Sequence, residues 1–228
     1  MKILIATKNP AKTRELKNFL QTSGLEVLSL ADFPDAPNIE ETGKTFEENA
    51  LLKAKSYYEW FVALSSAKIF ATDTTPRTSG AIEHLEQLNQ SKRFGVVADD
   101  GGLEIDALNG EPGVKSRRWP GHEANDDELI ALALEKLNGV PWEKRTARFR
   151  IVLAFYDGAR TETVTESSEG YITEQQRGSY EPGFPYRAIF WVPKFKKMFN
   201  ELTPEEHEQV NHRRFACLKL RDKILALL

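Results

Sequence analysis

Residues 96–106 read Val96-Val97-Ala98-Asp99-Asp100-Gly101-Gly102-Leu103-Glu104-Ile105-Asp106. The apolar residues ahead of the glycine pair predict a buried strand that ends in a tight turn. Two carboxylates at the end of such a strand are costly to bury unless a positive group meets them, and turn capping explains only one of them. Adjacent carboxylate oxygens suit the hard cation Mg²⁺. The stretch therefore predicts a metal site that includes Asp99 and Asp100, together with a phosphate that the metal serves.

The bulk composition is that of an ordinary globular protein. The 228 residues are 40% hydrophobic and 29% charged, with a formal net charge of −3. A chain of this length buries enough surface to form a core without disulfides. Length alone allows one large α/β domain or two small ones, and we expect a single domain over residues 1–228. The mixed charge lacks the basic field that nucleic-acid polymers require, so we do not expect such a partner.

Cysteine content and apolar runs indicate the compartment. The single cysteine, Cys217, forms no intrachain disulfide and is predicted to be a core side chain, which fits a reducing compartment. No apolar run reaches 18 residues, and the apolar stretch at the N-terminus is too short for a signal peptide. We therefore expect a cytoplasmic protein without a membrane segment.

Hydrophobic periodicity and capping residues predict alternating strands and helices. Strands are expected at residues 3–6, 27–30, 146–156 and 161–171, and a further apolar run covers 188–193. Helices are expected from Asn9-Pro10 to Gly24, from the capping box Thr45–Glu48 to about residue 65, and over 124–138 and 212–227. Strands and helices alternate in the first half and a hairpin follows at Asp157-Gly158, which predicts an α/β fold with a mixed sheet. Residues 66–94 are turn-rich, then amphipathic, and predict a surface insertion with a short helix.

The turn between the first strand and the first helix, Thr7-Lys8-Asn9-Pro10-Ala11-Lys12, has the features of a phosphate site. Backbone N–H groups and the positive end of the helix point to the same spot, and Lys12 reaches an anion there. The alternative is a helix cap without a ligand, because Asn at the N-cap and Pro at the first helical position are favourable in any helix.

Two further groups of side chains have a structural explanation beside a functional one. Glu41 and Lys53 either belong to a site or lie on solvated faces. Near the C-terminus, the aromatic loop Gly183–Tyr186 and the basic residues at 212–214 together suit a nucleobase. The aromatic rings could equally belong to the core, and His212 could be a helix cap.

Taken in order along the chain, these segments resemble the inosine triphosphate pyrophosphatase family, which hydrolyses deaminated purine nucleoside triphosphates. The similar blocks span nearly the whole chain apart from about 66–94, and they are Thr7–Lys12, Glu41–Ala50 with Lys53-Ala54, Ala98–Asp100, Gly102–Leu108, Gly113–Ser116, Ala147–Phe149, Gly183-Phe184 with Tyr186, Glu201–Thr203 and His212-Arg213.

The resemblance implies an elongated mixed β-sheet flanked by helices, with two lobes, a central substrate cleft and a homodimeric assembly. It implies hydrolysis of ITP, dITP and XTP to the monophosphate and pyrophosphate, with Mg²⁺ held by Glu41, Asp99 and Asp100. It implies that Asp100, as proton acceptor for water, is catalytic together with Lys12 and Lys53. The substrate-binding residues that it implies are Thr7, Lys8, Asn9, Lys12, Gly101, Phe184, Tyr186, Arg187, Lys197, His212 and Arg213.

The chain departs from the family pattern at the residues expected near the base. The family has Ser at the position of Gly101, and its Gly-Phe-Gly-Tyr-Asp is Gly183-Phe184-Pro185-Tyr186-Arg187 here. Residues 66–94 have no counterpart. Arg213 suits a 6-oxo group as a donor, and Arg187 adds a second donor or binds another group. Two alternatives therefore stay open: the same chemistry on a different modified nucleotide, and a non-catalytic nucleotide-binding protein.

Overall fold

The computed structural model describes residues 1–70 and 93–228. Within them the chain divides into two compact units. Unit 1 comprises Met1–Asp100, Val152–Val164 and Ala216–Leu228, and unit 2 comprises Gly101–Ile151 and Thr165–Phe215. The division falls within the stretch 96–106, between Asp100 and Gly101.

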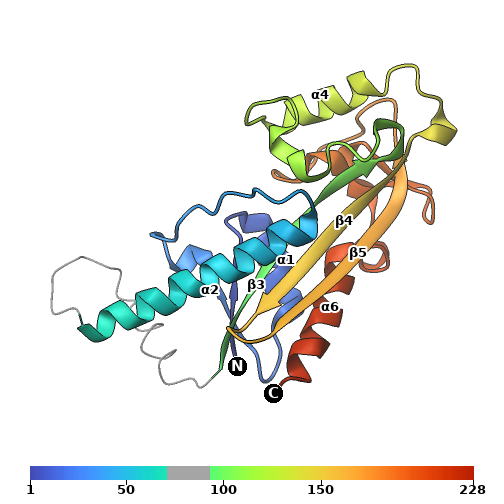
Figure 1. Ribbon diagram of the computed structural model, residues 1–228. Coiled ribbons are helices and arrows are strands. Elements are labelled where there is room, and N and C mark those ends of the chain that lie inside the picture. The colour runs from blue at the N-terminus through green and yellow to red at the C-terminus, as the bar shows by residue number, and fades with distance from the viewer. Residues whose placement is uncertain (71–92) are drawn as a thin grey trace. The chain divides into compact units, whose positions relative to one another are not determined.

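The strands of the described residues form a seven-stranded sheet of order β2-β1-β3-β4-β5-β6-β7 (Figure 1). The strands are β1 Lys2–Ile5, β2 Glu26–Ser29, β3 Phe94–Ile105, β4 Thr146–Tyr156, β5 Thr161–Ile172, β6 Phe190–Val192 and β7 Lys197–Met198. β1 pairs in parallel with both β2 and β3, whereas β6 pairs antiparallel with β5 and β7. The predicted α/β fold with a mixed sheet is therefore confirmed.

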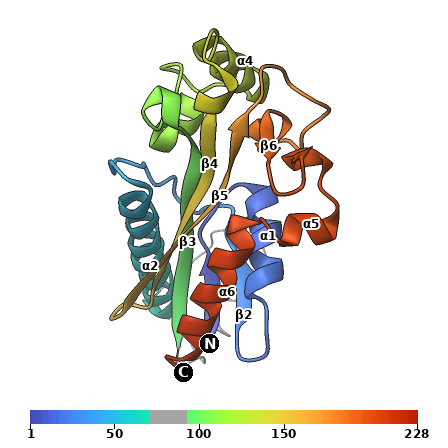
Figure 2. The same ribbon diagram turned by 90° about the vertical axis from the view of Figure 1, so that its right-hand side faces the viewer.

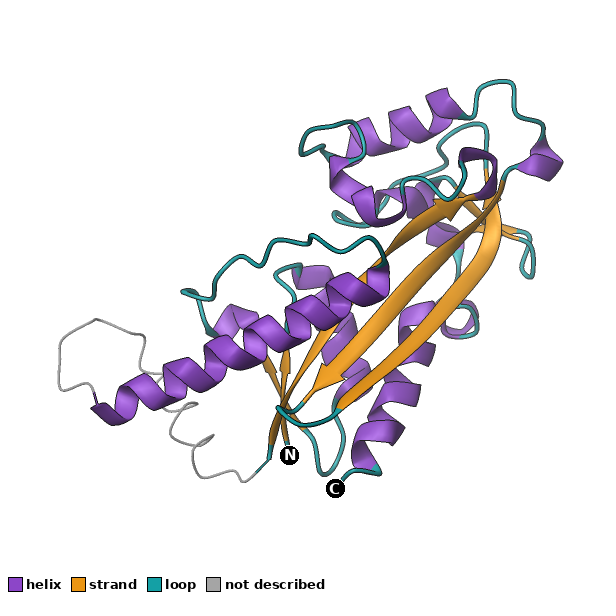
Figure 3. Ribbon diagram, viewed as in Figure 1, coloured by secondary structure: helices purple, strands orange, loops and turns teal. Residues whose placement is uncertain are grey.

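The α-helices of the described residues are α1 Pro10–Leu20, α2 Phe46–Phe70, α4 Asp126–Lys136, α5 Pro204–Glu208 and α6 His212–Leu225. Figure 2 shows α2 on one side of β3 and both α1 and α6 on the other. Figure 3 shows helices on both sides of the strands. Strands enclosed in this way are largely apolar, and β1 is buried along its whole length, including Lys2, its one charged residue. None of the helices in the described part of the chain is both long and apolar enough to span a membrane.

The strand that carries the two aspartates differs from the prediction. β3 runs from Phe94 to Ile105, so it continues through Gly101 and Gly102 and does not turn there. A glycine inside a strand allows another backbone to approach closely, and Gly101 is in that situation against β4. The prediction of a tight turn at the glycine pair was therefore wrong. Glycine is favoured both in tight turns and where two strands approach closely, and the second case depends on a tertiary contact that the local sequence does not reveal.

Two helix boundaries also differ from the prediction. α1 ends at Leu20 because Gln21 adopts an extended conformation, so Gly24 lies in the following turn. α2 continues to Phe70, beyond the predicted end at about residue 65. The other end of the predicted insertion, Phe94, begins β3, and most of that segment, including the short helix expected there, lies outside the described residues.

The later elements follow the sequence pattern. The hairpin between β4 and β5 turns at Asp157, whose side chain accepts hydrogen bonds from the backbone N–H groups of Ala159 and Arg160. The predicted helices over 124–138 and 212–227 correspond to α4 and α6. Cys217 is fully buried in α6, as expected of a core side chain.

Candidate active site

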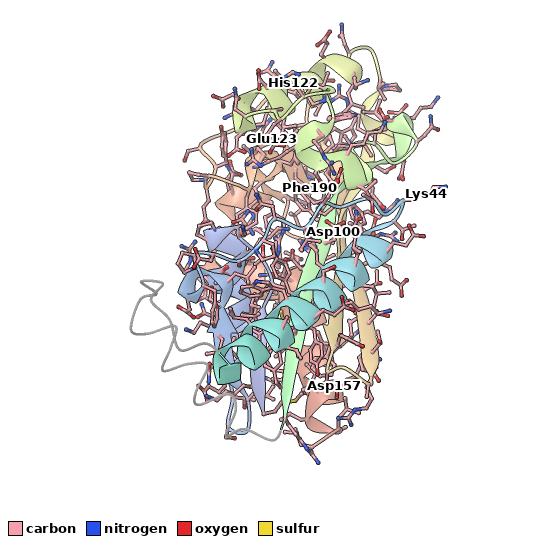
Figure 4. The ribbon with its side chains drawn as sticks, turned by 60° about the vertical axis from the view of Figure 1, so that its left-hand side comes forward. Lys44, Asp100, His122, Glu123, Asp157 and Phe190 are labelled. Atoms are coloured by element: carbon pink, nitrogen blue, oxygen red, sulfur yellow. The ribbon has the colours of Figure 1, made fainter. Side chains whose placement is uncertain are left out.

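Asp99 and Asp100 are both buried on β3, with relative exposures of 1% and 6%. Successive strand residues face opposite sides of a sheet, and the two carboxylates accordingly meet different helices. Asp99 Oδ2 lies 2.7 Å from Lys12 Nζ of α1, and Asp100 Oδ2 accepts a hydrogen bond of 3.0 Å from Asn49 Nδ2 of α2. Figure 4 shows Asp100 beside the N-terminal part of α2. The two aspartates thus have different hydrogen-bond partners on different helices.

Lys53 of α2 extends the charged group around Asp100. Its Nζ lies 2.5 Å from Glu41 Oε1, and its side chain is only 12% exposed. Burial acts to lower the pKa of Lys53, but the charges of Asp99, Asp100 and Glu41 outweigh it and raise that pKa. Lys53 is therefore a firmly protonated cation, and the alternative of a solvated lysine is wrong.

For Asp100, burial and not the neighbouring charges decides the direction of the pKa shift. Burial is the largest effect on its pKa and raises it, and the negative charge of Glu41 adds to that effect. Lys53, Lys12 and the hydrogen bond from Asn49 act against it, yet the pKa of Asp100 stays raised. Burial and the charge of Glu41 together thus outweigh the positive groups near Asp100.

The resemblance implies that these carboxylates hold Mg²⁺. No group of three or more His, Cys, Asp and Glu side chains in residues 1–70 and 93–228 is arranged to hold a metal ion. Asp99 is instead engaged by Lys12 at 2.7 Å. Mg²⁺ in nucleotide enzymes uses one or two carboxylates, with phosphate oxygens and water completing the shell. Glu41 and Asp100 match that smaller donor set in chemistry: the negative charge of Glu41 raises the pKa of Asp100, and Glu41 is paired with Lys53 as Asp99 is with Lys12.

The turn before α1 is a helix cap. Asn9 Oδ1 accepts hydrogen bonds from the backbone N–H groups of Ala11 and Lys12, at 3.0 and 3.2 Å. Thr7 Oγ1 accepts a hydrogen bond from the N–H of Asn9. The capping interpretation of Asn9 is therefore confirmed, and the cap fixes the first turn of α1, from which Lys12 extends.

Lys8 has different partners from Lys12. Its Nζ donates hydrogen bonds to Ala36 O at 2.8 Å and to Asn38 Oδ1 at 2.7 Å. Lys8 and Thr7 line a pocket of about 530 Å³ whose other lining residues include Thr13, Arg14, Lys17, Leu30 and Phe33. The structure thus brings Lys12, Lys53, Glu41 and the two aspartates into one charged cluster and places Lys8 in a separate pocket.

The residues expected near a base lie in unit 2. Phe184 is 7% exposed, and its ring carries the guanidinium groups of Arg187 and Arg213, whose Cζ atoms lie 3.9 and 4.7 Å from the ring centroid. Tyr186 belongs to the hydrophobic core of unit 2. Its hydroxyl has no hydrogen-bond partner in the described residues, and burial raises its pKa. The core interpretation therefore holds for Tyr186.

His212 and Lys197 have partners within unit 2. The His212 ring is buried and stacks on Phe149, with centroids 5.7 Å apart and an interplanar angle of 14°. His212 does not cap α6, because the N–H of Arg214 donates to Asn211 Oδ1. Lys197 Nζ lies 2.8 Å from both carboxylate oxygens of Glu206.

Comparison with known proteins decides the family. The model of the Ham1 family matches residues 3–223. The chain belongs to the Ham1 family. A dITP/XTP pyrophosphatase of Geobacillus kaustophilus is 41% identical over 97% of this chain and 93% of its own length, and one of Bacillus subtilis is 40% identical over 95% and 93%. The resemblance to the inosine triphosphate pyrophosphatase family is therefore confirmed.

Solved structures agree with this placement. The Staphylococcus aureus Ham1 protein matches with a TM-score of 0.75 and 29% identity, over the full length of both chains. A nucleoside-triphosphatase / dITP/XTP pyrophosphatase from Mycobacterium abscessus has a TM-score of 0.66 and 34% identity, covering 96% of this chain and 98% of its own. The mixed sheet of this chain is thus the Ham1 fold.

Two residues that hold candidate residues or their loops in place, one in each unit, were not predicted from the sequence. Asn49 is 1% exposed, and besides its bond to Asp100 its Oδ1 accepts a hydrogen bond from the N–H of Gly43, so it ties the preceding loop to the buried carboxylate. Asp126, the first residue of α4, accepts a hydrogen bond from the N–H of Gly183 and pairs with Arg117. Asn49 could have been predicted, because it is an amide in the first turn of α2 and lies four residues before Lys53, on the same helix face.

Gly101 is held by the neighbouring strand. A Cβ at this position would lie 2.3 Å from Arg150 O and 2.9 Å from Ile151 Cα, both backbone atoms of β4. Contacts that short cannot be relieved by a rotamer change. A serine at this position, as in the family pattern, would therefore require β3 and β4 to lie farther apart here.

Gly101→Ser is expected to lower the free energy of unfolding by about 1–3 kcal/mol, because the added Cβ forces the backbone of β4 to move. Urea denaturation measures this loss. Gly101→Ala is the matched control, since it adds the same Cβ without a hydroxyl and is expected to cost about as much. A serine variant as stable as the natural protein would contradict the close approach.

Proposed function

We propose that this protein hydrolyses deaminated purine nucleoside triphosphates, namely ITP, dITP and XTP, to the monophosphate and pyrophosphate in a Mg²⁺-dependent reaction. The observation that carries the proposal is the cluster in which Asp99, Asp100 and Glu41 meet Lys12 and Lys53. Relatives named dITP/XTP pyrophosphatase, about 40% identical over nearly the whole chain, support the same substrate class.

The chemistry follows from the charges of this cluster. Lys12 and Lys53 pair with carboxylates of this cluster. We assign both lysines to the phosphate oxygens, where positive charge offsets the charge that develops on the leaving pyrophosphate. Bound Mg²⁺ would supply Lewis-acid stabilisation of the same oxygens. Glu41 and Asp100 would hold it, with Asp99 keeping Lys12 in place.

Asp100 is assigned as the group that orients the attacking water and takes its proton. It is buried and is fixed by the hydrogen bond from Asn49, so its carboxylate is held in one position, as a proton acceptor for water requires. The proton moves from water to the carboxylate as the water oxygen attacks phosphorus and the bond to pyrophosphate breaks.

The remaining substrate contacts are assigned from the resemblance. Thr7, Lys8 and Asn9 would contribute to triphosphate binding through the turn that precedes α1. In unit 2, Phe184, Arg187, Lys197, His212 and Arg213 would contact base or sugar, with Tyr186 supporting the loop from the core and Gly101 contributing backbone only. We also propose a cytoplasmic homodimer, which light scattering would detect as twice the chain mass.

The test is a substrate panel. Purified protein with Mg²⁺ is mixed with ITP, dITP, XTP, ATP and GTP, and pyrophosphate release is measured. Hydrolysis of the first three well above the last two is expected. A panel in which ITP and XTP are not preferred would favour a second candidate function, the same chemistry on a different modified nucleotide. The charge reversal at Arg187 supports that alternative. Nucleotide binding without release of pyrophosphate from any of them would rule out the enzyme.

A further inference from the structure

We infer that a pocket on unit 2 is a second ligand site, which binds a planar aromatic anion of about the size of a nucleotide. The pocket has a volume of about 730 Å³, which is within the range of small-molecule sites. None of its lining residues belongs to the charged cluster around Asp100 or to the candidate substrate-binding residues. The pocket is therefore separate from the residues of the proposed function, and its ligand is tested independently of that function.

One wall of the pocket is aromatic. The rings of Trp142 and Tyr171 are stacked, with centroids 5.1 Å apart and an interplanar angle of 15°. Trp191 of β6 is the register partner of Tyr171 of β5, so these two side chains lie on the same face of the sheet. Trp142 is 43% exposed. A planar ring that stacks on this wall would cover aromatic surface that water otherwise contacts.

Charged side chains of both signs complete the lining. Arg177 and Lys196 supply two cations, and Glu174 supplies one carboxylate. All three are exposed, and none of their side chains forms an ion pair or a hydrogen bond with the described residues. The two cations suit a phosphate or carboxylate group, whereas Glu174 accepts a hydrogen bond from an N–H on the edge of a ring. The pocket therefore offers the groups that a heteroaromatic anion requires.

A buried arginine holds the walls of the pocket in place. Arg145 directly follows the 3₁₀ helix Trp142–Lys144 and is only 3% exposed. Its guanidinium donates hydrogen bonds to Leu137 O at 2.7 Å and to Thr173 O at 2.8 Å. It thus ties the segment that carries Trp142 to the residue after β5, which also lines the pocket. Contacts within unit 2 therefore fix the walls, so a ligand does not need to order them.

A small ligand fits these observations better than a second copy of the chain. The centre of a protein interface is depleted of charged residues, whereas three charged side chains without partners in the described residues surround this aromatic wall. Nucleotides and aromatic carboxylic acids share the chemistry that the pocket would recognise, because both combine a planar ring with an anionic group. The experiment therefore includes one compound of each kind.

Binding is measured by isothermal titration calorimetry, with AMP as the nucleotide and indole-3-carboxylate as the aromatic acid. We expect at least one of them to bind with a Kd below about 1 mM. Adenosine and ribose 5-phosphate are the matched fragments, because each lacks one of the two features. If AMP binds, it should do so at least about 10-fold more tightly than either fragment. Binding of AMP alone identifies a nucleotide site, and binding of indole-3-carboxylate alone identifies a site for aromatic acids.

Two variants place the ligand in this pocket. Trp142→Ala and Arg177→Gln are each expected to raise the Kd about 10-fold, through loss of stacking and of a charge-assisted hydrogen bond. Arg118→Gln, which replaces an exposed arginine elsewhere in unit 2, is the matched control and should keep the natural Kd. Lys53→Met should also keep it, because Lys53 belongs to the candidate active site. Neither pocket variant should change pyrophosphate release.

The inference is overturned if neither compound binds, or if Trp142→Ala and Arg177→Gln both leave the Kd unchanged. Circular dichroism identifies a variant that fails to fold, and Arg177→Gln, which replaces an exposed side chain, still tests the site if Trp142→Ala does not fold. Light scattering tests the other occupant. A lower molar mass of Trp142→Ala than of the natural protein, with neither compound bound by the latter, would show that this face is a contact between copies and that the inference is wrong.

Discussion

Asp100→Asn is expected to lower kcat for pyrophosphate release from ITP by at least about 100-fold, because asparagine keeps the shape of the side chain but cannot accept a proton from water. The hydrogen bond from Asn49 Nδ2 survives, since the amide oxygen of asparagine also accepts. The measurement is a continuous pyrophosphate assay at saturating Mg²⁺ and substrate, so that weaker metal binding does not imitate loss of the base.

The matched control for this variant is Asp222→Asn. Asp222 lies on α6 with a side chain that is 70% exposed, and the same substitution there should leave kcat within a factor of two of the natural value. If Asp100→Asn retained full activity, the assignment of Asp100 as proton acceptor would be wrong, and another group would have to activate the water.

Lys53→Met has the second largest expected effect, a loss of about 100-fold in kcat/KM. The variant removes a cation that we assign to the phosphate oxygens, and removing one such stabilising group typically costs this much. Methionine retains most of the alkyl chain, so packing along α2 is disturbed little. The loss is measured from initial rates with ITP over a range of substrate concentrations.

The same variant is expected to move the acid limb of the pH–rate profile. The charge of Lys53 lowers the pKa of Asp100, so its removal raises that pKa further. A higher pH is then needed to ionise Asp100 as a base, and the acid limb of kcat/KM shifts toward higher pH. Lys55→Met, two residues along the same helix at an exposed position, is the control and should leave both rate and profile unchanged. A Lys53→Met profile with an unmoved acid limb would show that Lys53 does not act on the base.

The residue types of the candidate site could be predicted because they occur in short, ordered motifs. The cap at Asn9 and Pro10 fixes α1, and Lys12 follows one turn later. The helix that carries Lys53 begins after Thr45, whose Oγ1 accepts from the N–H of Glu48 as a capping motif requires. These interactions join residues within one turn of helix, so their spacing along the chain is enough to predict them.

Asp99 and Asp100 were predicted as a pair at the end of a strand, just before a turn, and are found within β3, where they meet two different helices. The glycines suggested a chain reversal, but Gly101 lies in a continuous strand beside the backbone of Arg150. The identity of the partner of each aspartate depends on contacts across 87 and 51 residues of sequence. Periodicity in one segment carries no information on such contacts, because they arise when the sheet brings distant segments together.

By itself, the sequence determined an α/β fold with a mixed sheet and a buried aspartate pair that needs positive charge, whereas Glu41 and Lys53 were added to that site by the family resemblance. The fold and the aspartate pair follow from hydrophobic period, helix caps and charges that must be compensated, all of which act over a few residues. Only the tertiary structure decided which lysine meets Asp99, why position 101 is a glycine, and that the Arg187 guanidinium lies on the Phe184 ring. These depend on how closely strands and loops pack in space, and burial then turns each contact into a strong electrostatic constraint.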